Sequence, residues 1–502
     1  MDASRRGILL AAGAGLLLLA RPGGAQDPAR RADKFEPVRA AIRRVMDSTG
    51  VPGVAVALAQ NGRITWEEGF GWADRERRIP ATEHTMFSLA SISKPITATG
   101  LMRLVEERKV DLDAPANQYL GLGKLTGLAG DANQATVRRV MSHTAGLPLH
   151  YTFYYAGVNG GDEPTMDEAI SRYGILVYPP GQAYQYSNLG YGIVDHIIER
   201  VSGVPYADYM RTRVFAPLGL TRMSVHIGPG LESYVARRYD SRLRPIPFYD
   251  FDHDGGSAVW ASAHDLVRFG MFHLKERLTD QQRILADSTI DLMHRSATPP
   301  SALGGYGLGW GSVDEFGFQR VNHTGGMPGV ATILAIYPAQ RTAVVVLTNK
   351  AGTPYERILQ EILSVAFPPR YADSLRARRA QGRRPPDGVR FSPPAELVGE
   401  WTGTLRTWQQ TVPFKLAVQQ DGDALVTLGD RVPALLAGAR WADGVLTGRF
   451  AGSVPTPDAG RYPHSVWVQL RLIDGKLKGQ ASAQTTDEPV YFALTSYLEM
   501  GK

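Results

Sequence analysis

Hydrophobic and polar residues follow two different periods along the chain, and the change of period divides the sequence into regions. From residue 35 to 46, apolar positions recur at helical spacing and predict an amphipathic helix. Two β-rich runs follow, VPGVAVALAQ and RITWEEGFGWA, joined by Asn61-Gly62. Because a type I′ turn needs positive φ at both central residues, Asn-Gly between two such runs predicts a tight hairpin.

The middle of the chain is mostly helical and irregular, and strands return after it. The run SNLGYGIVDHIIERVSG predicts a helix, since Ile193, Ile197 and Val201 share one face and Gly203 ends it. The later runs RVNHTGG, VATILAIYP and RTAVVVLTNK are strand-like. We therefore expect an α+β domain over residues 30–368, whose sheet is completed by the two ends of the region, with a mainly helical insertion between them.

The C-terminal part of the chain has another pattern. Residues 369–392 are rich in Pro and Arg and predict a linker. Residues 393–502 contain about eight short β runs, with Asp-Gly turns at Asp421, Asp443 and Asp474. These turns are unevenly spaced, which argues against a repeat array. We expect a separate closed antiparallel barrel or sandwich.

The first 25 residues have the features of a signal peptide. Arg5 and Arg6 precede an apolar stretch, and small residues at Gly23 and Ala25 predict cleavage after Ala25. The arginine pair also fits a twin-arginine signal, so the sequence leaves open which of the two export routes is used. No later segment reaches the roughly 18 apolar residues of a membrane span. We expect a periplasmic or secreted protein without an integral membrane segment in its mature chain.

The amino-acid composition excludes every function that needs a cysteine. The 502 residues are 43% hydrophobic, carry a formal charge of +6 and include no cysteine. Disulfides, thiolate catalysis, iron–sulfur clusters, cysteine-ligated zinc and a lipid-modified N-terminal cysteine are excluded. The arginines clustered in residues 370–384 have neither a recognition motif nor an aromatic platform beside them. A solvated linker explains them better than a nucleic-acid site, and we expect no nucleic-acid partner.

The stretch FSLASISKPITATGLMRLVEERKV carries the first candidate for chemistry. Its apolar spacing predicts a helix from near Ser91 to about Arg108, with Lys94 one turn after Ser91 on the same face. The helix N-terminus can stabilise an alkoxide, and a lysine among apolar residues loses its proton more easily. The alternative is that Ser91 caps the helix and Lys94 extends to water. This is the only S-x-x-K in the chain.

Two further motifs follow in order. In GQAYQYSNLGYG, Tyr186 is a candidate base, whose phenolate would become accessible beside a lysine ammonium, and Asn188 could donate its amide to a substrate carbonyl. The alternative is a helix cap with a packed tyrosine. In RVNHTGGMPG, glycines at the end of a strand expose backbone N–H groups that can bind an oxyanion. Taken alone, this third motif is typical of a turn.

The ordered triplet S-x-x-K, Y-x-N and [KH]-T-G resembles that of the serine β-lactamase and penicillin-binding-protein superfamily. The similarity is to the branch with class C β-lactamases, D-aminopeptidases and β-lactamase-like esterases, and MSHTAGLP, GGSAVWASAHDLVRFG and YGLGW also resemble this family. It covers roughly residues 35–368. The resemblance implies an α+β β-lactamase/DD-peptidase-like fold, an antiparallel sheet flanked by helices, and an appended lipocalin-like barrel.

The resemblance also implies roles for the motif residues. Ser91 would be the acylated nucleophile, and Lys94 with Tyr186 the proton-transfer pair. The remaining residues would bind substrate or its oxyanion: Asn188, His323, Thr324, Gly325 and Gly326. Within this set, the backbone N–H groups of Ser91 and Gly326 would form the oxyanion hole.

One departure from the β-lactamase pattern bears on the substrate. His323 stands where a lysine normally binds the substrate carboxylate, and a histidine is mostly neutral near pH 7. We therefore expect an exported serine hydrolase acting on an ester or amide, as a small ester, a D-residue peptide or a β-lactam-like compound. The rival hypotheses are a true β-lactamase and a penicillin-binding or interaction module without turnover.

No cofactor or metal is expected. Asp252-His253-Asp254 groups ligand-type residues, but a metal-binding motif is absent, and a polar loop near the cleft explains them better. We expect the C-terminal barrel to restrict the substrate cleft or to mediate pairing of protomers into a homo-oligomer. The sequence does not choose between these two tasks.

Overall fold

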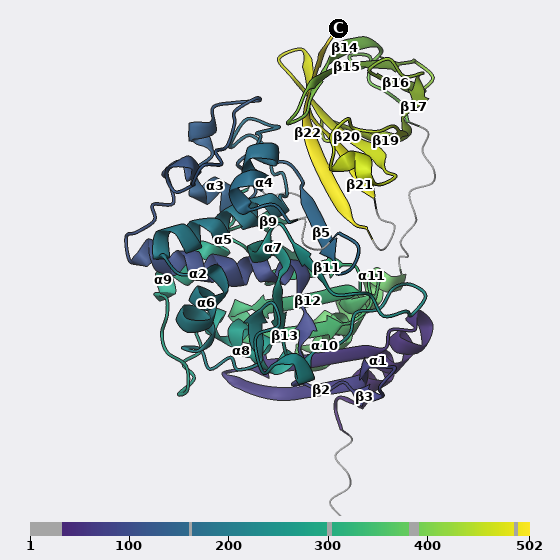
Figure 1. The fold of residues 1–502 in the computed structure, drawn as a ribbon. Coiled ribbons are helices and arrows are strands. Elements are labelled where there is room, and N and C mark those ends of the chain that lie inside the picture. The colour runs from purple at the N-terminus through teal and green to yellow at the C-terminus, as the bar shows by residue number, and fades with distance from the viewer. Residues whose placement is uncertain (1–32, 160–162, 299–303, 381–390, 486–489) are drawn as a thin grey trace, which may run out of the picture.

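The computed structural model describes residues 33–159, 163–298, 304–380, 391–485 and 490–502. The expected signal peptide lies outside these ranges. The larger part of the molecule is an α+β domain, and a β-barrel stands against one end of it (Figure 1). Within the described ranges, none of the helices combines the length and the apolarity needed to cross a bilayer.

The central sheet of the large domain is antiparallel and has the strand order β3-β2-β1-β13-β12-β11-β10-β9. Its N-terminal hairpin pairs with the strands that return late in the domain, with Val54 opposite Thr348. This confirms the prediction that the two ends of the region complete one sheet. The strands are β1 (Gly53–Gln60), β2 (Arg63–Asp74), β3 (Ile79–Pro80), β9 (Gly305–Tyr306), β10 (Gly311–Glu315), β11 (Phe318–Met327), β12 (Val330–Tyr337) and β13 (Thr342–Thr348).

Both faces of this sheet are covered, so its central strands are buried throughout. Along β1, Val54, Val56 and Leu58 pack in one cluster with α1 (Glu36–Thr49) and α10 (Tyr355–Ala366). The alternate residues of β1 are alanines and face α8 (Ala263–His273) and the helical insertion. A strand with two buried faces is expected to be apolar throughout, as VAVALA is.

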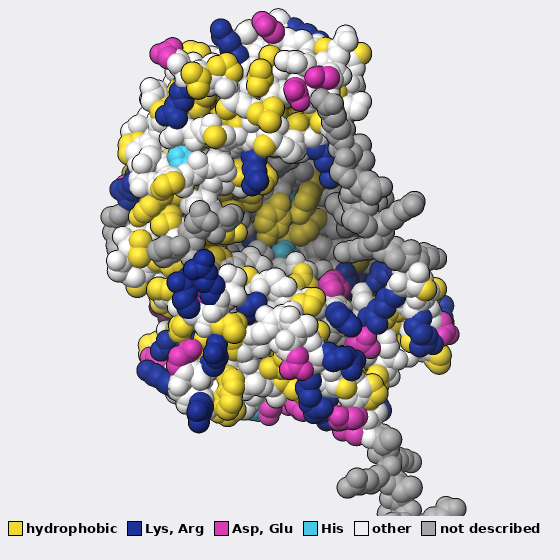
Figure 2. Space-filling view, turned by 90° about the vertical axis from the view of Figure 1, so that its right-hand side faces the viewer, with side chains coloured by type: hydrophobic (Ala, Val, Ile, Leu, Met, Phe, Trp, Pro, Cys, Tyr) yellow, Lys and Arg dark blue, Asp and Glu magenta, His cyan; other side chains and the backbone are white. Residues whose placement is uncertain are grey.

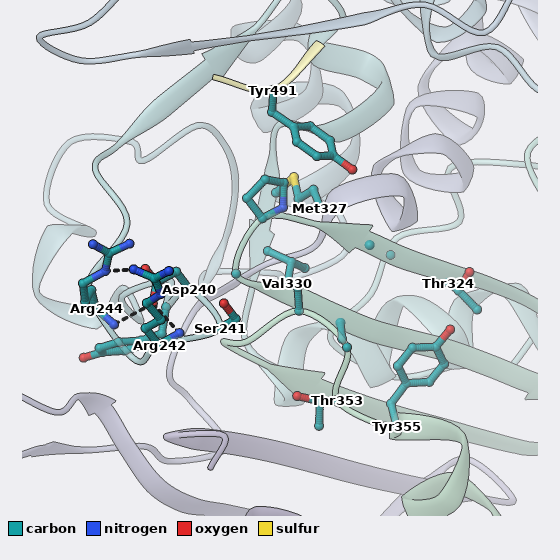
Figure 3. A pocket seen from close by; sticks show the side chains of 18 residues that line it. Asp240, Ser241, Arg242, Arg244, Thr324, Met327, Val330, Thr353, Tyr355 and Tyr491 are labelled. Atoms are coloured by element: carbon teal, nitrogen blue, oxygen red, sulfur yellow. Dashed lines mark hydrogen bonds and ion pairs between the residues drawn. The ribbon is translucent and has the colours of Figure 1, made fainter. Parts of the chain in front are cut away.

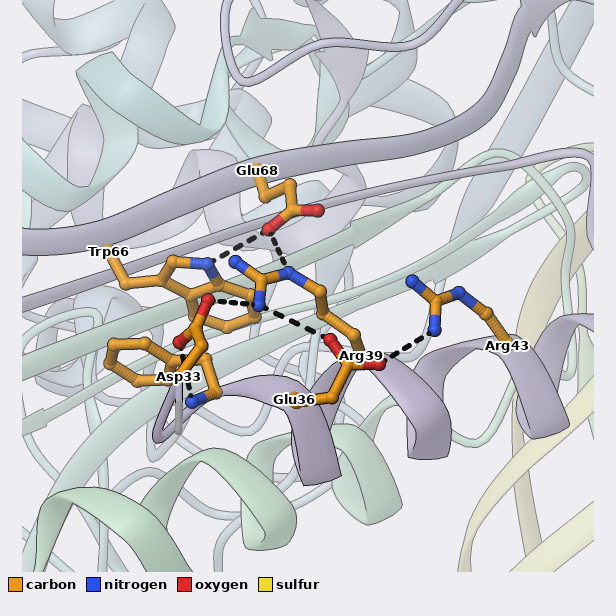
Figure 4. A network of polar contacts seen from close by, with 7 residues as sticks. Asp33, Glu36, Arg39, Arg43, Trp66 and Glu68 are labelled. Atoms are coloured by element: carbon orange, nitrogen blue, oxygen red, sulfur yellow. Dashed lines mark hydrogen bonds and ion pairs between the residues drawn. The ribbon is translucent and has the colours of Figure 1, made fainter. Parts of the chain in front are cut away.

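The hairpin at Asn61-Gly62 forms as predicted, with φ angles of 51° and 75°. The opening helix, expected at residues 35–46, runs slightly further as α1. Arg39 on this helix joins it to strand β2 by binding Glu68, while also contacting Asp33 and Glu36 (Figure 4). This polar network holds the exposed side of α1 to strand β2, while the opposite side of α1 packs in the core.

Two helices of the insertion bring the motif residues together. Helix α5 (Asn188–Ser202) is capped by the Ser187 side chain, and Gly203 closes it in the left-handed conformation, as the sequence predicted. Helix α2 (Ser93–Glu106) begins two residues later than predicted, because a 3₁₀ turn, η1 (Ala90–Ile92), precedes it. The other helices are α3 (Val137–Met141), α4 (Met166–Tyr173), α6 (Tyr206–Met210), α7 (Asp254–Ser257) and α9 (Asp287–His294).

Part of the expected linker is a helix. Helix α11 (Pro369–Ala380) packs on the large domain through Tyr371 and Leu375, which are both buried. The linker prediction is therefore wrong for these residues, because two apolar side chains one turn apart dock the helix despite its arginines. Residues 381–390 lie outside the described ranges.

The C-terminal strands form a nearly closed antiparallel barrel (Figure 1), with the order β17-β16-β15-β14-β22-β21-β20-β19-β18. Large side chains such as Trp401, Phe414 and Phe450 are buried in it, so its interior is a packed core. The strands are β14 (Gly399–Arg406), β15 (Thr411–Val418), β16 (Ala424–Leu428), β17 (Ala434–Leu435), β18 (Ala437–Ala442), β19 (Val445–Ala451), β20 (Ser465–Ile473), β21 (Lys476–Thr485) and β22 (Phe492–Gly501).

The barrel docks on the large domain by strand pairing. Strand β22 pairs antiparallel with β5 (Tyr151–Tyr155) of the insertion, and β5 in turn pairs with β7 (Tyr249–Phe251). Side chains reinforce the contact: Tyr178 donates to the backbone carbonyl of Gln469 at 2.9 Å, and Gln469 donates to Gln185 at 3.0 Å. Gln185 immediately precedes Tyr186, so the barrel is tied directly to one of the motif loops.

Candidate active site

The serine of the S-x-x-K motif lies on a strained turn. Ala90, immediately before it, has φ of +49° and is buried. A non-glycine residue in the left-handed region costs about 1–2 kcal/mol, and such strain concentrates where the surroundings impose it for function. Ser91 therefore does not cap α2, contrary to the capping alternative; its hydroxyl points instead to Lys94 and Tyr186.

Lys94 is fully buried, so the alternative in which it extends to water is wrong. Its Nζ lies 3.1 Å from Ser91 Oγ, 2.8 Å from Asn188 Oδ1 and 3.0 Å from the carbonyl oxygen of Gly256. No carboxylate contacts Nζ within the described part of the chain. Burial without a counter-ion lowers the pKa of Lys94 well below 10.5, as the sequence predicted.

Tyr186 completes the contacts of the serine hydroxyl. Its OH donates to Ser91 Oγ at 2.8 Å, and burial raises its pKa above 10. Lys94 Nζ lies over the face of the Tyr186 ring, 4.8 Å from the centroid, and not beside the phenol oxygen. The prediction of an accessible phenolate is therefore wrong, because burial outweighs any help from the lysine. Tyr186 is a protonated donor in this arrangement.

His143 supports the Tyr186 loop, although the sequence assigned it no role. His143, from MSHTAGLP, packs its ring 4.4 Å from that of Tyr186, and its Nδ1 accepts the backbone N–H of Ser187 at 3.2 Å. Burial lowers the pKa of His143 well below 6.5, so the ring is neutral and can accept this bond. His143 thus positions the Tyr186 loop. Its place in a motif was the only signal available in the sequence.

The third motif lies on β11, beside the turn that carries Ser91. A side chain at Gly325 would place its Cβ 2.0 Å from the carbonyl oxygen of Leu89, so only glycine lets the strand approach this turn. Gly326 is exposed and its α-carbon faces open space. The strand therefore packs against the turn at one glycine and presents its backbone to the cleft at the next.

His323 faces the cleft wall as a neutral ring. Burial first, and then the charge of Lys94, lower its pKa to about 3. Its Nδ1 donates to the carbonyl oxygen of Thr324 at 2.7 Å, and its Nε2 accepts from the Tyr306 hydroxyl at 2.9 Å. The prediction of a neutral group at this position is confirmed. Both ring nitrogens already have partners, which leaves the residue without a charge for a substrate carboxylate.

Two cavities open on either side of Thr324, which lines both. The larger, of about 780 Å³, lies beyond Gly326 along β11 and reaches Tyr491 of the C-terminal part of the chain (Figure 3). The smaller, of about 480 Å³, lies towards His323 and is lined by Tyr184, Tyr186 and Tyr306. Figure 2 shows a hollow with hydrophobic side chains at its base, between the barrel and the rest of the molecule.

The residues Asp252 and His253 are part of a buried network rather than a polar loop, which corrects the sequence interpretation. Asp252 binds His253 Nδ1 through one oxygen and His150 Nε2 through the other, both at 2.6 Å. Although burial opposes it, the two histidines hold the Asp252 pKa well below 3.8. No three His, Asp or Glu residues in the described ranges are grouped so that they could hold a metal.

A family model described as "Beta-lactamase" matches residues 38–366. The chain is 28% identical to penicillin-binding protein 4* of Bacillus subtilis (strain 168) over 342 residues, which are 61% of this chain and 70% of that protein. It is also 28% identical to the unguisins hydrolase ungD' of Aspergillus campestris over 328 residues, 61% of this chain and 60% of that protein.

Solved structures with similar folds fall into two groups by the length they share. An octameric penicillin-binding protein homologue from Pyrococcus abyssi superposes with a TM-score of 0.56 at 21% identity, over 91% of this chain and 99% of its own. The structure of SurE superposes with a TM-score of 0.61 at 21% identity, over 93% of this chain and 99% of its own. A class C β-lactamase from Rhodobacter sphaeroides, with a TM-score of 0.54 at 23% identity, covers 68% of this chain and 99% of its own. The longer matches therefore extend beyond the α+β domain.

Proposed function

Because the chain belongs to the β-lactamase family, we propose that it is a serine hydrolase in which Ser91 attacks an ester or amide carbonyl. The observation that carries this proposal is the pair of contacts on Ser91 Oγ, from Lys94 Nζ at 3.1 Å and from the Tyr186 hydroxyl at 2.8 Å. A buried amine without a counter-ion is a base, and a protonated phenol is an acid. The serine hydroxyl lies between the two.

The proton route follows from the acceptors around Lys94. A neutral amine has two hydrogens, which match the oxygens of Asn188 and Gly256, and its lone pair is then directed to the Ser91 hydroxyl. As Ser91 Oγ bonds to the substrate carbon, its proton passes to Lys94. The leaving group takes a proton from Tyr186, which Lys94 replaces. Water then repeats the sequence in reverse and releases the acyl group.

The oxyanion and the substrate are assigned to the third motif and to Asn188. The N–H groups of Ser91 and Gly326 stabilise the negative oxygen of the tetrahedral intermediate. Asn188, whose oxygen is held by Lys94, directs its amide N–H to the substrate, and Thr324 with Gly325 lines the strand on which the substrate docks. His323, being neutral, favours substrates without a carboxylate at this place.

We assign the substrate to small esters and D-residue peptides ahead of β-lactams. The neutral His323 supports this order, and one similar solved structure is described as SurE with D-Leu. We also propose export to the periplasm or beyond by residues 1–25, by the Sec or the Tat route. A homo-oligomer is proposed on the likeness to an octameric homologue.

The test is a hydrolysis panel of p-nitrophenyl esters, D-aminoacyl p-nitroanilides and nitrocefin with the Ser91→Ala variant. We expect kcat/KM to fall by about 10⁴-fold or more on every substrate turned over, and an acyl adduct on Ser91 by mass spectrometry to disappear. Ser93→Ala is the matched control, since Ser93 Oγ accepts the backbone N–H of Val259 at 3.0 Å and should affect stability, by about 1 kcal/mol, more than rate.

Three outcomes would change the proposal. Full activity of Ser91→Ala would overturn the mechanism. A kcat/KM on nitrocefin far above that on the esters would make the protein a true β-lactamase. Stoichiometric acylation of Ser91 without release of product would make it a penicillin-binding module without turnover.

A further inference from the structure

The two cavities can be assigned to the two halves of a substrate, if the proposed function holds. The leaving group has to take its proton from Tyr186, and Tyr186 lines the smaller cavity. The leaving group therefore occupies the smaller cavity. The acyl group then extends the other way along β11, past Gly326, into the larger cavity, which we call the acyl cavity.

The wall of the acyl cavity is formed by three segments of the large domain and by one residue of the barrel region. One side is the end of β11 and the turn after it, with Met327, Pro328 and Val330, and another is the segment that carries Thr353 and Tyr355. A third side is the polar segment 239–244, which includes Asp240, Arg242 and Arg244 (Figure 3). Tyr491, next to the start of barrel strand β22, is the sole residue of the barrel region among those lining the cavity within the described ranges. Figure 3 shows its ring above Met327, on the side away from Tyr355.

The position of the Tyr491 ring is fixed by neighbours of the large domain. It stacks on Tyr151, with ring centroids 5.3 Å apart and planes inclined by 17°, and on Phe153, at 5.1 Å and 18°. Both partners lie on β5, the strand that pairs with β22. Tyr151 and Phe153 also stack on each other, with centroids 5.6 Å apart and planes inclined by 26°. The three rings therefore form one aromatic cluster, which limits the movement of the Tyr491 ring and makes it a firm wall for an acyl group.

We infer that Tyr491 determines specificity for the acyl group, and that the barrel thereby selects substrates with an aromatic or bulky apolar acyl part. Such a group would pack between the Tyr491 ring and the Met327 side chain, and a short acyl group such as acetyl would reach neither. Tyr491, Met327 and Val330 form an apolar side of this otherwise polar cavity, and truncating such a side changes discrimination by about 10-fold or more. The effect should fall on the ratio between long and short acyl groups, because Ser91 and its contacts are unchanged.

The experiment compares p-nitrophenyl acetate with p-nitrophenyl phenylacetate, which share one leaving group. For Tyr491→Ala we expect kcat/KM on the phenylacetate to fall about 10-fold relative to the acetate. Tyr491→Phe should keep the ratio of the natural protein, since the ring remains. Trp467→Ala is the matched control, because Trp467 is an exposed aromatic residue on barrel strand β20 that does not line the cavity. It should leave the ratio unchanged.

Two results would overturn the inference. The first is an unchanged acyl ratio in Tyr491→Ala, and the second is an equal fall on both esters, which would mean that the ring serves only to dock the barrel. If Tyr491→Ala does not fold, Tyr491→Leu gives the same ratio test with an apolar side chain in place. Absence of an acyl adduct on Ser91 would instead disprove the proposed function, so the two failures are distinguishable.

Discussion

Lys94 and Arg39 are both basic side chains held by several hydrogen bonds, but their partners are of opposite kinds. Lys94 is buried and contacts a hydroxyl, an amide oxygen and a backbone carbonyl, all of them neutral. Arg39 lies at the rim of α1 and contacts the carboxylates of Asp33, Glu36 and Glu68 (Figure 4).

The difference shows in the pKa of each group. Burial lowers the pKa of Lys94, whereas the hydrogen bonds that Arg39 donates to Asp33 and then to Glu68 raise the pKa of Arg39 above its usual value. Carboxylate partners keep a charge in place, and neutral partners leave a proton that can be removed. The fold therefore uses a permanent charge to fasten a helix and places an amine that loses its proton more easily beside Ser91.

Of the two basic side chains, Lys94 should show the larger effect when its amine is removed. Lys94→Met keeps most of the side-chain volume but removes the base, and kcat/KM should fall by about 10³-fold on any substrate of the natural protein. Steady-state kinetics with a thermal melt to confirm folding is the measurement. A kcat/KM within tenfold of that of the natural protein would show that the amine of Lys94 is not the base and would contradict the comparison with Arg39.

The pH dependence of kcat/KM should show that the proton on Lys94 is removable. Protonated Lys94 cannot accept the serine proton, so the rate falls about tenfold per pH unit below its pKa and is flat above it. Because burial lowers this pKa well below 10.5, the plateau should already be reached below pH 10. His323, with a pKa of about 3, should add no limb between pH 5 and 9, and Tyr186, whose pKa is raised, none on the alkaline side below pH 10. A rate that still rises above pH 10 would contradict the assignment.

The smallest effect is expected at Arg39. Arg39→Met removes ion pairs with partly exposed partners, so the free energy of unfolding should fall by about 1 kcal/mol. Urea denaturation measures this, and kcat/KM of the folded variant should stay within twofold. Raising the salt concentration should reduce the difference between variant and natural protein. A loss of activity without loss of stability would give this network a role beyond the helix.

Local signals in the sequence predicted much of the fold. Residues close together in the sequence determine the Asn61-Gly62 turn and the α5 helix with its Gly203 end. The hydrophobic pattern predicted the sheet that is built from both ends of the domain. The three motifs also led to side chains that the structure brings together around Ser91. Their chemical roles remain proposals.

The features that escaped prediction depend on distant contacts. The direction of the Tyr186 pKa shift depends on whether burial or the nearby lysine dominates, and tertiary packing decides this. In the folded protein, burial raises the pKa of Tyr186. The left-handed Ala90 has no sequence signal, since alanine does not favour this conformation, and it lies in a turn that strand β11 approaches through Gly325. Tyr491 lies in another fold unit from Ser91, and the docking of the barrel, with β22 paired to β5, brings it to the cleft.

The pairing of β22 with β5 also affects the order in which the protein gains its properties during synthesis. A ribosome makes Ser91, Lys94 and Tyr186 well before it makes Tyr491, and N-terminal domains generally fold first. A growing or cleaved chain without β22 would hold the groups proposed for acyl transfer while its acyl cavity lacked the barrel-side wall. Such a chain would be an unselective hydrolase, and selectivity would be the last property that the folding protein gains.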